Sequence, residues 1–267
     1  MELLLETELL FGSIKWGKTM KWNQLLSWKN TKPFLGSYID WSHPLAQGLV
    51  GCWLFNEGSG NLVFDLSLHG NSGTLINGPT WVAGRTGLAL EFDGEDDYVE
   101  VADSTSLDLP EELTVIANFK TNVIPSSGVK TIVSKDTNYE FHINSNGEIW
   151  WWWKDSDETQ HTLIGTKTIQ TGVYYQVAIV YSKFQGKARI YLNGDLDVEG
   201  SFTQSLMLNT NPFQIGNDQG HTGRFFDGLI DEVRIYNRAL SPSEIAYLHS
   251  EPYCFILNPI MDYVIEG

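Results

Sequence analysis

The central part of the chain alternates apolar and polar residues over short stretches that turn residues interrupt. In residues 113–120 the odd positions are Leu, Val, Ala and Phe, whereas three of the four even positions are polar. Successive side chains of a strand point to opposite faces of a sheet, so this pattern predicts a half-buried strand. Similar stretches predict strands over residues 49–55, 88–92, 98–101, 139–143, 148–154, 174–181, 188–192, 195–199 and 229–236.

The residues between these stretches predict tight turns. Residues 144–147, Asn-Ser-Asn-Gly, separate two apolar runs, and Asn193-Gly194 separates two more. Asn and Gly adopt positive φ at little cost, so both sequences predict hairpins. Asp93-Gly94 predicts a further turn. Many short strands joined by Gly- and Asn-rich turns are typical of an all-β sandwich or barrel.

One short helix is expected near the end of the strand-rich region. Ser241 can cap the helix, Pro242 suits its first position, and Glu244 completes a capping box. Ile245 and Leu248 then share a face. The pattern predicts a helix over about residues 242–249 that packs against the sandwich.

The pattern divides the chain into three regions. Residues 1–45 form an irregular arm whose scattered tryptophans follow neither a strand nor a helix period. Residues 46–250 form the sandwich, and residues 251–267 form an apolar tail interrupted by Pro252 and Pro259. We expect the arm and the tail to serve assembly or docking, including self-association of the chain.

Charge and composition exclude several classes of partner. The formal net charge is -16 and the hydrophobic fraction is 42%, so the chain can bury a large core but repels nucleic acids and anionic lipids. It has no apolar run of about 18 residues that could cross a membrane. The first residues lack the basic segment of a secretory signal. We expect synthesis in the cytoplasm and, if the chain acts outside a cell, display on a virion surface.

The chain has two cysteines, Cys52 and Cys254. Two cysteines in this length do not make a disulfide framework, so we expect both to be free and buried. A disulfide between them would require the first and last strands of the sandwich to be neighbours.

Four sequence blocks resemble the laminin-G-like domains of the concanavalin A-like superfamily. They are GLVGCWLFNEGSGNLVFDLSLHGNSGTL (48–75), LALEFDGEDDYVEV (88–101), YLNGDL (191–196) and GLIDEVRIYNRALSPSEI (228–245). The blocks follow the order of that family. The resemblance implies an all-β, two-sheet antiparallel jelly-roll sandwich. It leaves the function open, because this fold carries lectins, adhesion modules, glycosidases and virion proteins.

Four consecutive tryptophans, Trp150, Trp151, Trp152 and Trp153, are the most unusual feature of the sequence. On a strand one pair faces the core and the other pair faces outward. An outward pair could be covered by the arm, could stack on sugar rings, or could enter a protein interface. We take the four tryptophans as candidate ligand-binding residues, together with Asp155 and His161, which could bind sugar hydroxyls.

The resemblance also implies a structural calcium ion. Asp65 and Asp231 match positions at which related sandwiches join an early loop to the last strand through calcium, and Asn71 could add an oxygen. The alternative is that Asp65 caps its own turn and Asp231 pairs with Arg234 or Arg85.

Catalytic and transition-metal signals are weak. Glu91-Phe92-Asp93-Gly94-Glu95 formally resembles the acidic strand of related glucanases, but Gly94 indicates a turn where a regular strand would be needed. No histidine pair has zinc-binding spacing, and residues 216–221 are expected to form a surface loop. The six histidines are His43, His69, His142, His161, His221 and His249.

The sequence therefore favours a non-enzymatic recognition module that binds a glycan or a protein through an aromatic sheet face or the end loops. The alternative is a structural protein of a bacteriophage virion, such as a capsid-decoration, fibre or tail component, whose arm docks on the particle. A glycoside hydrolase is the third and weakest hypothesis.

Overall fold

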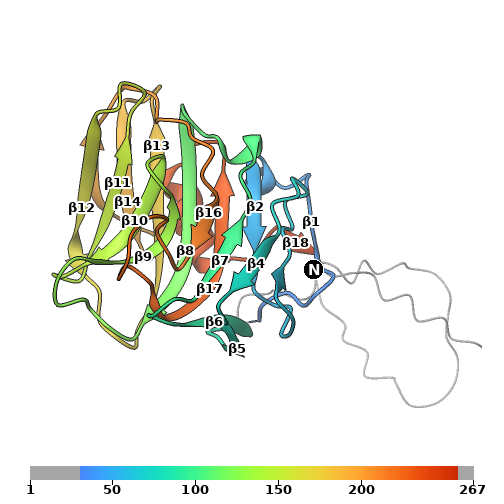
Figure 1. The fold of residues 1–267 in the computed structure, drawn as a ribbon. Coiled ribbons are helices and arrows are strands. Elements are labelled where there is room, and N and C mark those ends of the chain that lie inside the picture. Colours follow the sequence, from blue (N-terminus) through green and yellow to red (C-terminus); the bar gives the residue numbers. More distant parts are fainter. Residues whose placement is uncertain (1–30, 258–267) are drawn as a thin grey trace, which may run out of the picture.

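The computed structural model describes residues 31–257, which form two antiparallel β-sheets stacked face to face (Figure 1). We call the sheet that carries the four tryptophans the tryptophan sheet and the other the helix-side sheet. The fold class predicted from the sequence, an all-β two-sheet sandwich with one short helix, is confirmed.

The tryptophan sheet has eight strands. Their order across the sheet is β12 (Gln160–Thr168), β11 (Glu148–Lys154), β10 (Tyr139–Asn144), β9 (Val129–Lys135), β16 (Phe213–Ile215), β7 (Tyr98–Val101), β4 (Gly73–Ile76) and β3 (Leu62–Val63).

The helix-side sheet is built around two ten-residue strands at its centre. Its order is β15 (Asp195–Ser201), β14 (Lys187–Leu192), β13 (Tyr174–Ser182), β8 (Glu112–Thr121), β17 (Asp227–Tyr236), β6 (Leu88–Asp93) and β5 (Thr80–Ala83), and β2 (Leu49–Trp53) also pairs with β17. Two 3-10 turns, Pro44–Ala46 and Thr105–Leu107, lie in the connections.

The main core lies between the two sheets and follows the predicted alternation. Leu113, Val115, Ala117 and Phe119 of β8 all point into it. Ile116 points the other way, into a second apolar cluster on the outer face of the helix-side sheet. One strand therefore supplies both clusters because its side chains alternate between the two faces.

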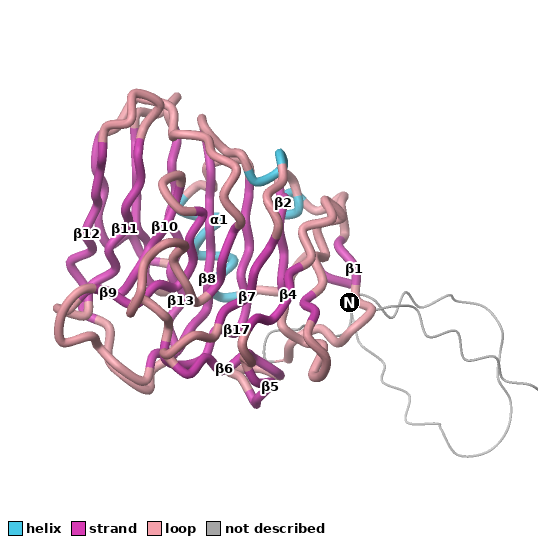
Figure 2. The backbone as a smooth tube through the Cα atoms, in the orientation of Figure 1, coloured by secondary structure: helices cyan, strands magenta, loops and turns pink. Residues whose placement is uncertain are grey.

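The second cluster exists because the helix and the chain ends cover that outer face. Helix α1 (Pro242–Ser250) contributes Ile245 and Leu248 to it. In Figure 2 the helix lies behind the sheets. The short strands β1 (Tyr38–Ile39) and β18 (Ile256–Leu257) pair with each other and add Ile39 and Ile256. The described parts of the arm and tail thus pack together on the sandwich, and residues 1–30 and 258–267 lie outside the described chain.

The sequence patterns located most of the long strands. Every predicted strand is present with similar bounds, both predicted hairpins form, and the capping box of Ser241 and Glu244 starts the helix. Strands with irregular patterns were missed, including β9, β12 and β16. β9 is buried at six of its seven positions, so it shows no alternation.

The two cysteines are free, as expected; Cys52 is buried and Cys254 is partly buried. Within residues 31–257 we find no helix with the length and apolar character needed to span a bilayer.

Candidate functional site

The four tryptophans of β11 divide between the two faces of their sheet. Trp151 and Trp153 are almost completely buried, and their ring centroids lie 4.6 Å apart in the core. Trp150 and Trp152 are half-buried on the outer face. The alternation follows directly from strand geometry.

The outer pair has neighbours on both sides. Trp150 lies between His142 of β10 and Ile164 of edge strand β12, and the Trp150 and His142 ring centroids are 5.9 Å apart. Trp152 lies between Glu140 and Thr162. Ile164 is 45% exposed. We call the surface formed by Trp150, Trp152, Thr162 and Ile164 the tryptophan platform.

The other predicted ligand-binding residues do not belong to this platform, which corrects the sequence-based assignment. Trp151 and Trp153 are in the core and cannot contact a ligand. His161 stacks on Trp153 and is therefore on the core side of the sheet. Asp155 is buried at the β11–β12 turn, where it accepts hydrogen bonds from the backbone N–H groups of 157 and 159 and pairs with His161 Nε2 at 2.7 Å. Trp153, His161 and Asp155 therefore pack together at the end of β11.

A buried cluster of acids and a histidine lies beside the platform. Glu140, His142 and Asp218 are each at most 2% exposed, and their potential ligand atoms all lie within 4.8 Å of one another. His142 Nε2 is 3.4 Å from Glu140 Oε2. On the other side of the ring, His142 Nδ1 is 2.9 Å from the hydroxyl of Thr131.

Burial changes the protonation of this cluster. Burial, with the nearby Asp218 charge, raises the pKa of Glu140 to about 9, and burial lowers the pKa of His142 to about 3. A carboxyl group with a raised pKa and a histidine with a lowered pKa are both neutral at pH 7, because the interior disfavours isolated charges.

Asp218 reaches the cluster from the loop between β16 and β17. This loop lies over the outer face of the tryptophan sheet, where Gly216 N–H donates to the Ile132 carbonyl and Thr131 N–H donates to the Arg224 carbonyl. Arg224 forms an ion pair with Asp218, and His221 Nδ1 is 3.3 Å from Asp218 Oδ2.

Sequence reasoning missed this cluster. The alternation of β10 places Glu140 and His142 on one face, and that signal was present in the sequence. Residues 216–221 do form a loop, as expected, but nothing in the sequence showed that Asp218 would be fully buried against β10.

The three predicted calcium ligands do not form one site. Asp65 accepts hydrogen bonds from Cys52 N–H, from the backbone and hydroxyl of Ser67 and from Asn71 N–H, so it caps its own turn. The Asn71 side chain donates to the Val50 carbonyl and to Ser106.

Asp231 contacts other residues. Its carboxylate forms a buried ion pair with Lys32 and accepts from the Arg85 backbone N–H. An ammonium in this contact repels a second cation. Asp231 therefore does not join Asp65 and Asn71 in one set of ligands, and calcium binding by the chain stays a prediction.

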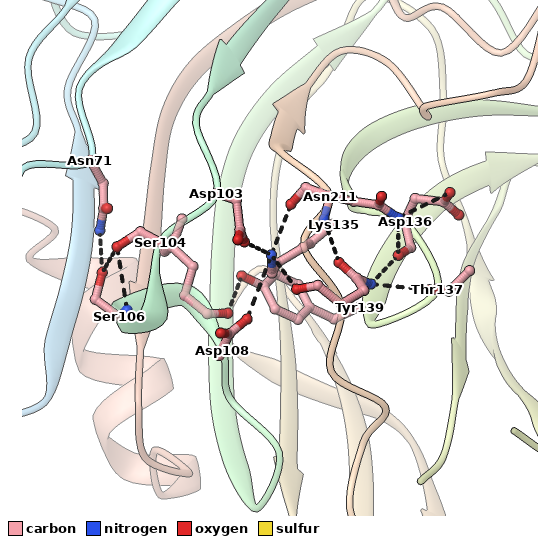
Figure 3. A network of polar contacts seen from close by, with 12 residues as sticks. Asn71, Asp103, Ser104, Ser106, Asp108, Lys135, Asp136, Thr137, Tyr139 and Asn211 are labelled. Carbon is pink, nitrogen blue, oxygen red and sulfur yellow. Dashed lines mark hydrogen bonds and ion pairs between the residues drawn. The ribbon is translucent and has the colours of Figure 1, made fainter. Parts of the chain in front are cut away.

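A lysine occupies an oxygen-rich position at one end of the sandwich (Figure 3). Lys135 is completely buried, and its Nζ lies 2.6 Å from Asp103 Oδ1, 2.8 Å from the Asn211 carbonyl and 3.6 Å from Asp108 Oδ1. Carboxylates and carbonyls are the ligands of hard cations. Here the ammonium group of Lys135 occupies the position that such a cation would take. It links the loops around residues 103–108 and 209–211 to β9.

The helix-side sheet has a pocket on its outer face, next to the end of α1. Its volume is about 370 Å³. The buried Gln176 Oε1 and His249 Nδ1 in its wall have no hydrogen-bond partner in the described chain. A polar ligand could bind in this pocket as well as on the tryptophan platform. Its lining residues are Arg85, Thr86, Asn118, Gln176, Asp231, His249, Ser250, Pro252 and Tyr253.

The acidic sequence that resembles a glucanase strand ends in a turn. Gly94 has φ of 78°, and Asp93 Oδ1 accepts the backbone N–H of Glu95 at 2.8 Å. Glu95 therefore lies beyond the strand that carries Glu91. The three carboxylates do not line one face of a regular strand, which a retaining pair of carboxylates would need.

Comparisons with known proteins agree with this architecture. No curated protein matches the sequence. Among solved structures, the binding domain of Paraclostridial Mosquitocidal Protein 1 is similar with a TM-score of 0.67 at 18% identity, over 77% of this chain and 52% of that one. This chain therefore spans about half the length of that structure.

Two further structures were solved with carbohydrates. Domain 4 of AbnA, a GH43 extracellular arabinanase from Geobacillus stearothermophilus in complex with arabinotriose, has a TM-score of 0.61 at 22% identity, over 75% of this chain and 98% of that one. The botulinum neurotoxin serotype D ligand binding domain in complex with N-acetylneuraminic acid has a TM-score of 0.61 at 17% identity, over 76% and 51%.

At these identities the structural likeness shows the fold alone. The family is shown by the sequence itself, because the Laminin_G_3 family profile matches residues 93–246, which is more than half of the chain. The profile covers both hairpins, the tryptophan strand and most of the helix. The chain belongs to the concanavalin A-like lectin/glucanases superfamily.

Proposed function

We propose that this chain is a non-enzymatic, lectin-like recognition module that binds a glycan on the tryptophan platform. The observation that carries the proposal is the pair of half-buried indoles, Trp150 and Trp152, on one face of β11. Sugar rings stack their apolar C–H faces on such surfaces, and aromatic side chains combine a large contact area with a polar edge. Solved structures of the same fold in complex with arabinotriose or N-acetylneuraminic acid support the choice of a glycan.

The surroundings of the platform suit a hydroxyl-rich ligand. The exposed Thr162 supplies a hydroxyl next to Trp152. The Trp150 indole N–H has no acceptor among the described residues, although it is buried. Protein atoms cover this N–H, so a ligand on the platform would contact the exposed parts of the indole rings and the Thr162 hydroxyl. A protein interface remains the alternative use of the same surface.

The proposal excludes hydrolysis as the role of the sandwich. The acidic sequence at residues 91–95 breaks into a turn, so it does not supply two opposed carboxylates. We expect the chain to leave β-glucan and arabinan oligosaccharides uncleaved.

A glycan array with the full chain tests the proposal. We expect binding to a restricted set of glycans, followed by a loss of at least about tenfold in affinity for Trp152→Ala, because stacked aromatic residues dominate such contacts. Tyr247→Ala is the matched control, since Tyr247 is 47% exposed on α1, away from the platform. The control should bind like the unchanged chain.

Two outcomes would contradict the placement of the site. If Trp152→Ala binds normally while Gln176→Ala does not, the ligand occupies the pocket of the helix-side sheet. If the array gives no binding but a protein partner is lost with Trp152→Ala, the platform is a protein interface.

The arm and tail carry the second part of the proposal, a docking role on a virion or another assembly. Residues 31–45 and 251–257 are already used by the sandwich, where β1 pairs with β18. Docking would therefore fall to residues 1–30 and 258–267. The solution mass of the full chain and of a variant without residues 1–30 tests this, and a monomeric mass for each of them would argue against self-association through the arm.

A further inference from the structure

We propose that Glu140, His142 and Asp218, completed by His221 of the covering loop, form a binding site for a zinc-type divalent cation. Two imidazoles and two carboxylates are a ligand set that zinc takes in four-coordinate sites. The proposal is independent of the glycan-binding function, although the site lies next to the tryptophan platform.

The distances between the ligand atoms fit such an ion. Ligands about 2.0–2.1 Å from a tetrahedral centre lie about 3.3–3.4 Å from one another. His142 Nε2 and Glu140 Oε2 are 3.4 Å apart, and His221 Nδ1 and Asp218 Oδ2 are 3.3 Å apart. The atoms of Glu140, His142 and Asp218 are all within 4.8 Å of one another, so small side-chain adjustments would bring these three around one centre. His221 lies outside that group and contacts Asp218, so its side chain, which is 47% exposed, has to turn inward to become the fourth ligand.

The buried carboxyl group of Glu140 provides an independent observation. Glu140 is 2% exposed and its side chain is hydrogen bonded to Asp218, yet its Oε2, 3.4 Å from His142 Nε2, has no hydrogen bond of normal geometry in the described chain. Such an unpaired buried oxygen is costly, and in native structures it often indicates an ion or a water molecule. A cation between Glu140 and Asp218 would bind this oxygen of Glu140, whereas the Asp218 carboxylate already accepts from the Ser134 hydroxyl and pairs with Arg224.

His142 is held as metal-binding histidines usually are. Its Nδ1 is hydrogen bonded to the Thr131 hydroxyl at 2.9 Å, and its Nε2 lies 3.4 Å from Glu140 Oε2. A hydrogen bond to one ring nitrogen fixes the orientation of the other toward a metal. Thr131 would therefore act as a positioning residue outside the ligand set.

The backbone around the site is shaped to hold the loop that brings Asp218 and His221. The pairing of β9 with β10 shifts register between Phe141 and His142. Bulges of this kind redirect side chains and release backbone groups from the ladder. Thr131 N–H and the Ile132 carbonyl beside this shift bind the loop instead of a strand.

One residue opposes the cation. The Arg224 guanidinium is paired with Asp218 and would be repelled by a divalent ion. Its side chain is 31% exposed, so it can turn toward solvent when the ion binds. This predicts that Arg224→Gln binds zinc more tightly than the unchanged chain.

A calorimetric titration of the chelator-treated full chain with zinc tests the proposal. We expect one ion per chain, a weakening of at least about tenfold for His142→Gln, and about tenfold for Thr131→Val, as for other outer-sphere partners. His249→Gln and His161→Gln are matched controls, since both histidines lie away from the cluster. They should bind zinc unchanged.

Cobalt supplies a readout that does not depend on the stability of a variant. Co²⁺ in a four-coordinate nitrogen and oxygen site absorbs strongly in the visible range, unlike the six-coordinate aqueous ion. We expect this spectrum for the unchanged chain and its loss in His221→Ala, whose exposed side chain can be removed without disturbing the core.

The proposal fails if zinc does not bind at micromolar concentration, if cobalt keeps the spectrum of the aqueous ion, or if His142→Gln and Asp218→Asn bind as well as the unchanged chain. In each case the cluster is a neutral hydrogen-bonded group that only anchors the loop.

Discussion

The outer faces of the two sheets differ in what covers them. Ile116, Ala178, Val180 and Tyr191 on the helix-side sheet are buried beneath α1 and the chain ends. On the tryptophan sheet the corresponding central positions are polar, including Thr131, Glu140 and His142, and the loop after β16 lies over them. The apolar outer positions of the helix-side sheet are buried by α1 and the chain ends through the hydrophobic effect. The loop after β16 is held on the tryptophan sheet by polar contacts, and it leaves Trp150 and Trp152 half-exposed.

The largest expected effect comes from breaking a buried ion pair on the covered face. Arg234 and Glu232 are at most 1% exposed, their nearest atoms are 3.0 Å apart, and Arg234 lies over the rings of Tyr253 and Phe255. Arg234→Met leaves an uncompensated buried carboxylate, which costs about 3–5 kcal/mol of unfolding free energy. Urea denaturation measures this loss.

A double variant is the control for this effect. Replacing both Glu232 and Arg234 by Met removes the charges together, so it should recover most of the lost stability. If Arg234→Met were as stable as the unchanged chain, water would have to reach the Glu232 carboxylate despite its burial.

The two tryptophan pairs provide the sharpest comparison within one strand. Trp151→Ala empties a buried site between the sheets and should cost about 3–5 kcal/mol of unfolding free energy. Trp152→Ala on the outer face should cost about 1 kcal/mol. Denaturation of both variants under the same conditions checks the difference, and equal losses would contradict the assignment of Trp152 to an open face.

The capping box of α1 predicts a smaller effect that depends on pH. Burial raises the pKa of Glu244, but hydrogen bonds from Ser241 and the Arg238 guanidinium outweigh it and hold the pKa below its ordinary value of 4.5. A lowered pKa in the folded state means that Glu244 stabilises the helix above pH 4.5 and that this contribution is lost as the pH falls further. Ser241→Ala should cost about 1 kcal/mol at pH 7.

The measurement is thermal unfolding of the unchanged chain and of Glu244→Gln between pH 7 and pH 3. Their difference in stability should shrink as the pH falls. A constant difference would indicate that the ionised carboxylate of Glu244 is not what stabilises the cap.

Calcium should have the smallest effect. Because Asp231 is neutralised by Lys32 and Asp65 caps its own turn, we expect excess Ca²⁺ added after EDTA to change the melting temperature less than any substitution above. A rise in melting temperature with Ca²⁺ that Asp65→Asn abolishes would support the calcium site predicted from the family resemblance.

The sequence by itself determined the features that depend on local geometry. The period of two placed the side chains of β8 on the correct faces and divided the tryptophans of β11 into two pairs, the Asn-Gly turns located two hairpins, and Ser241 and Glu244 started the helix. The family resemblance was also present in the residues and is confirmed by the match over residues 93–246.

The tertiary structure decided which distant groups meet. Alternation could not show which tryptophan pair faces outward, that Lys32 would neutralise Asp231, or that Asp218 would be buried against Glu140 and His142. The physical reason is that strand periodicity depends on adjacent residues, whereas such contacts depend on which loops cover each sheet. The packing of the whole sandwich decides which loops cover each sheet. The contacts that result join residues far apart in the sequence: His142 and Asp218 are 76 residues apart, and Lys32 and Asp231 are 199 residues apart.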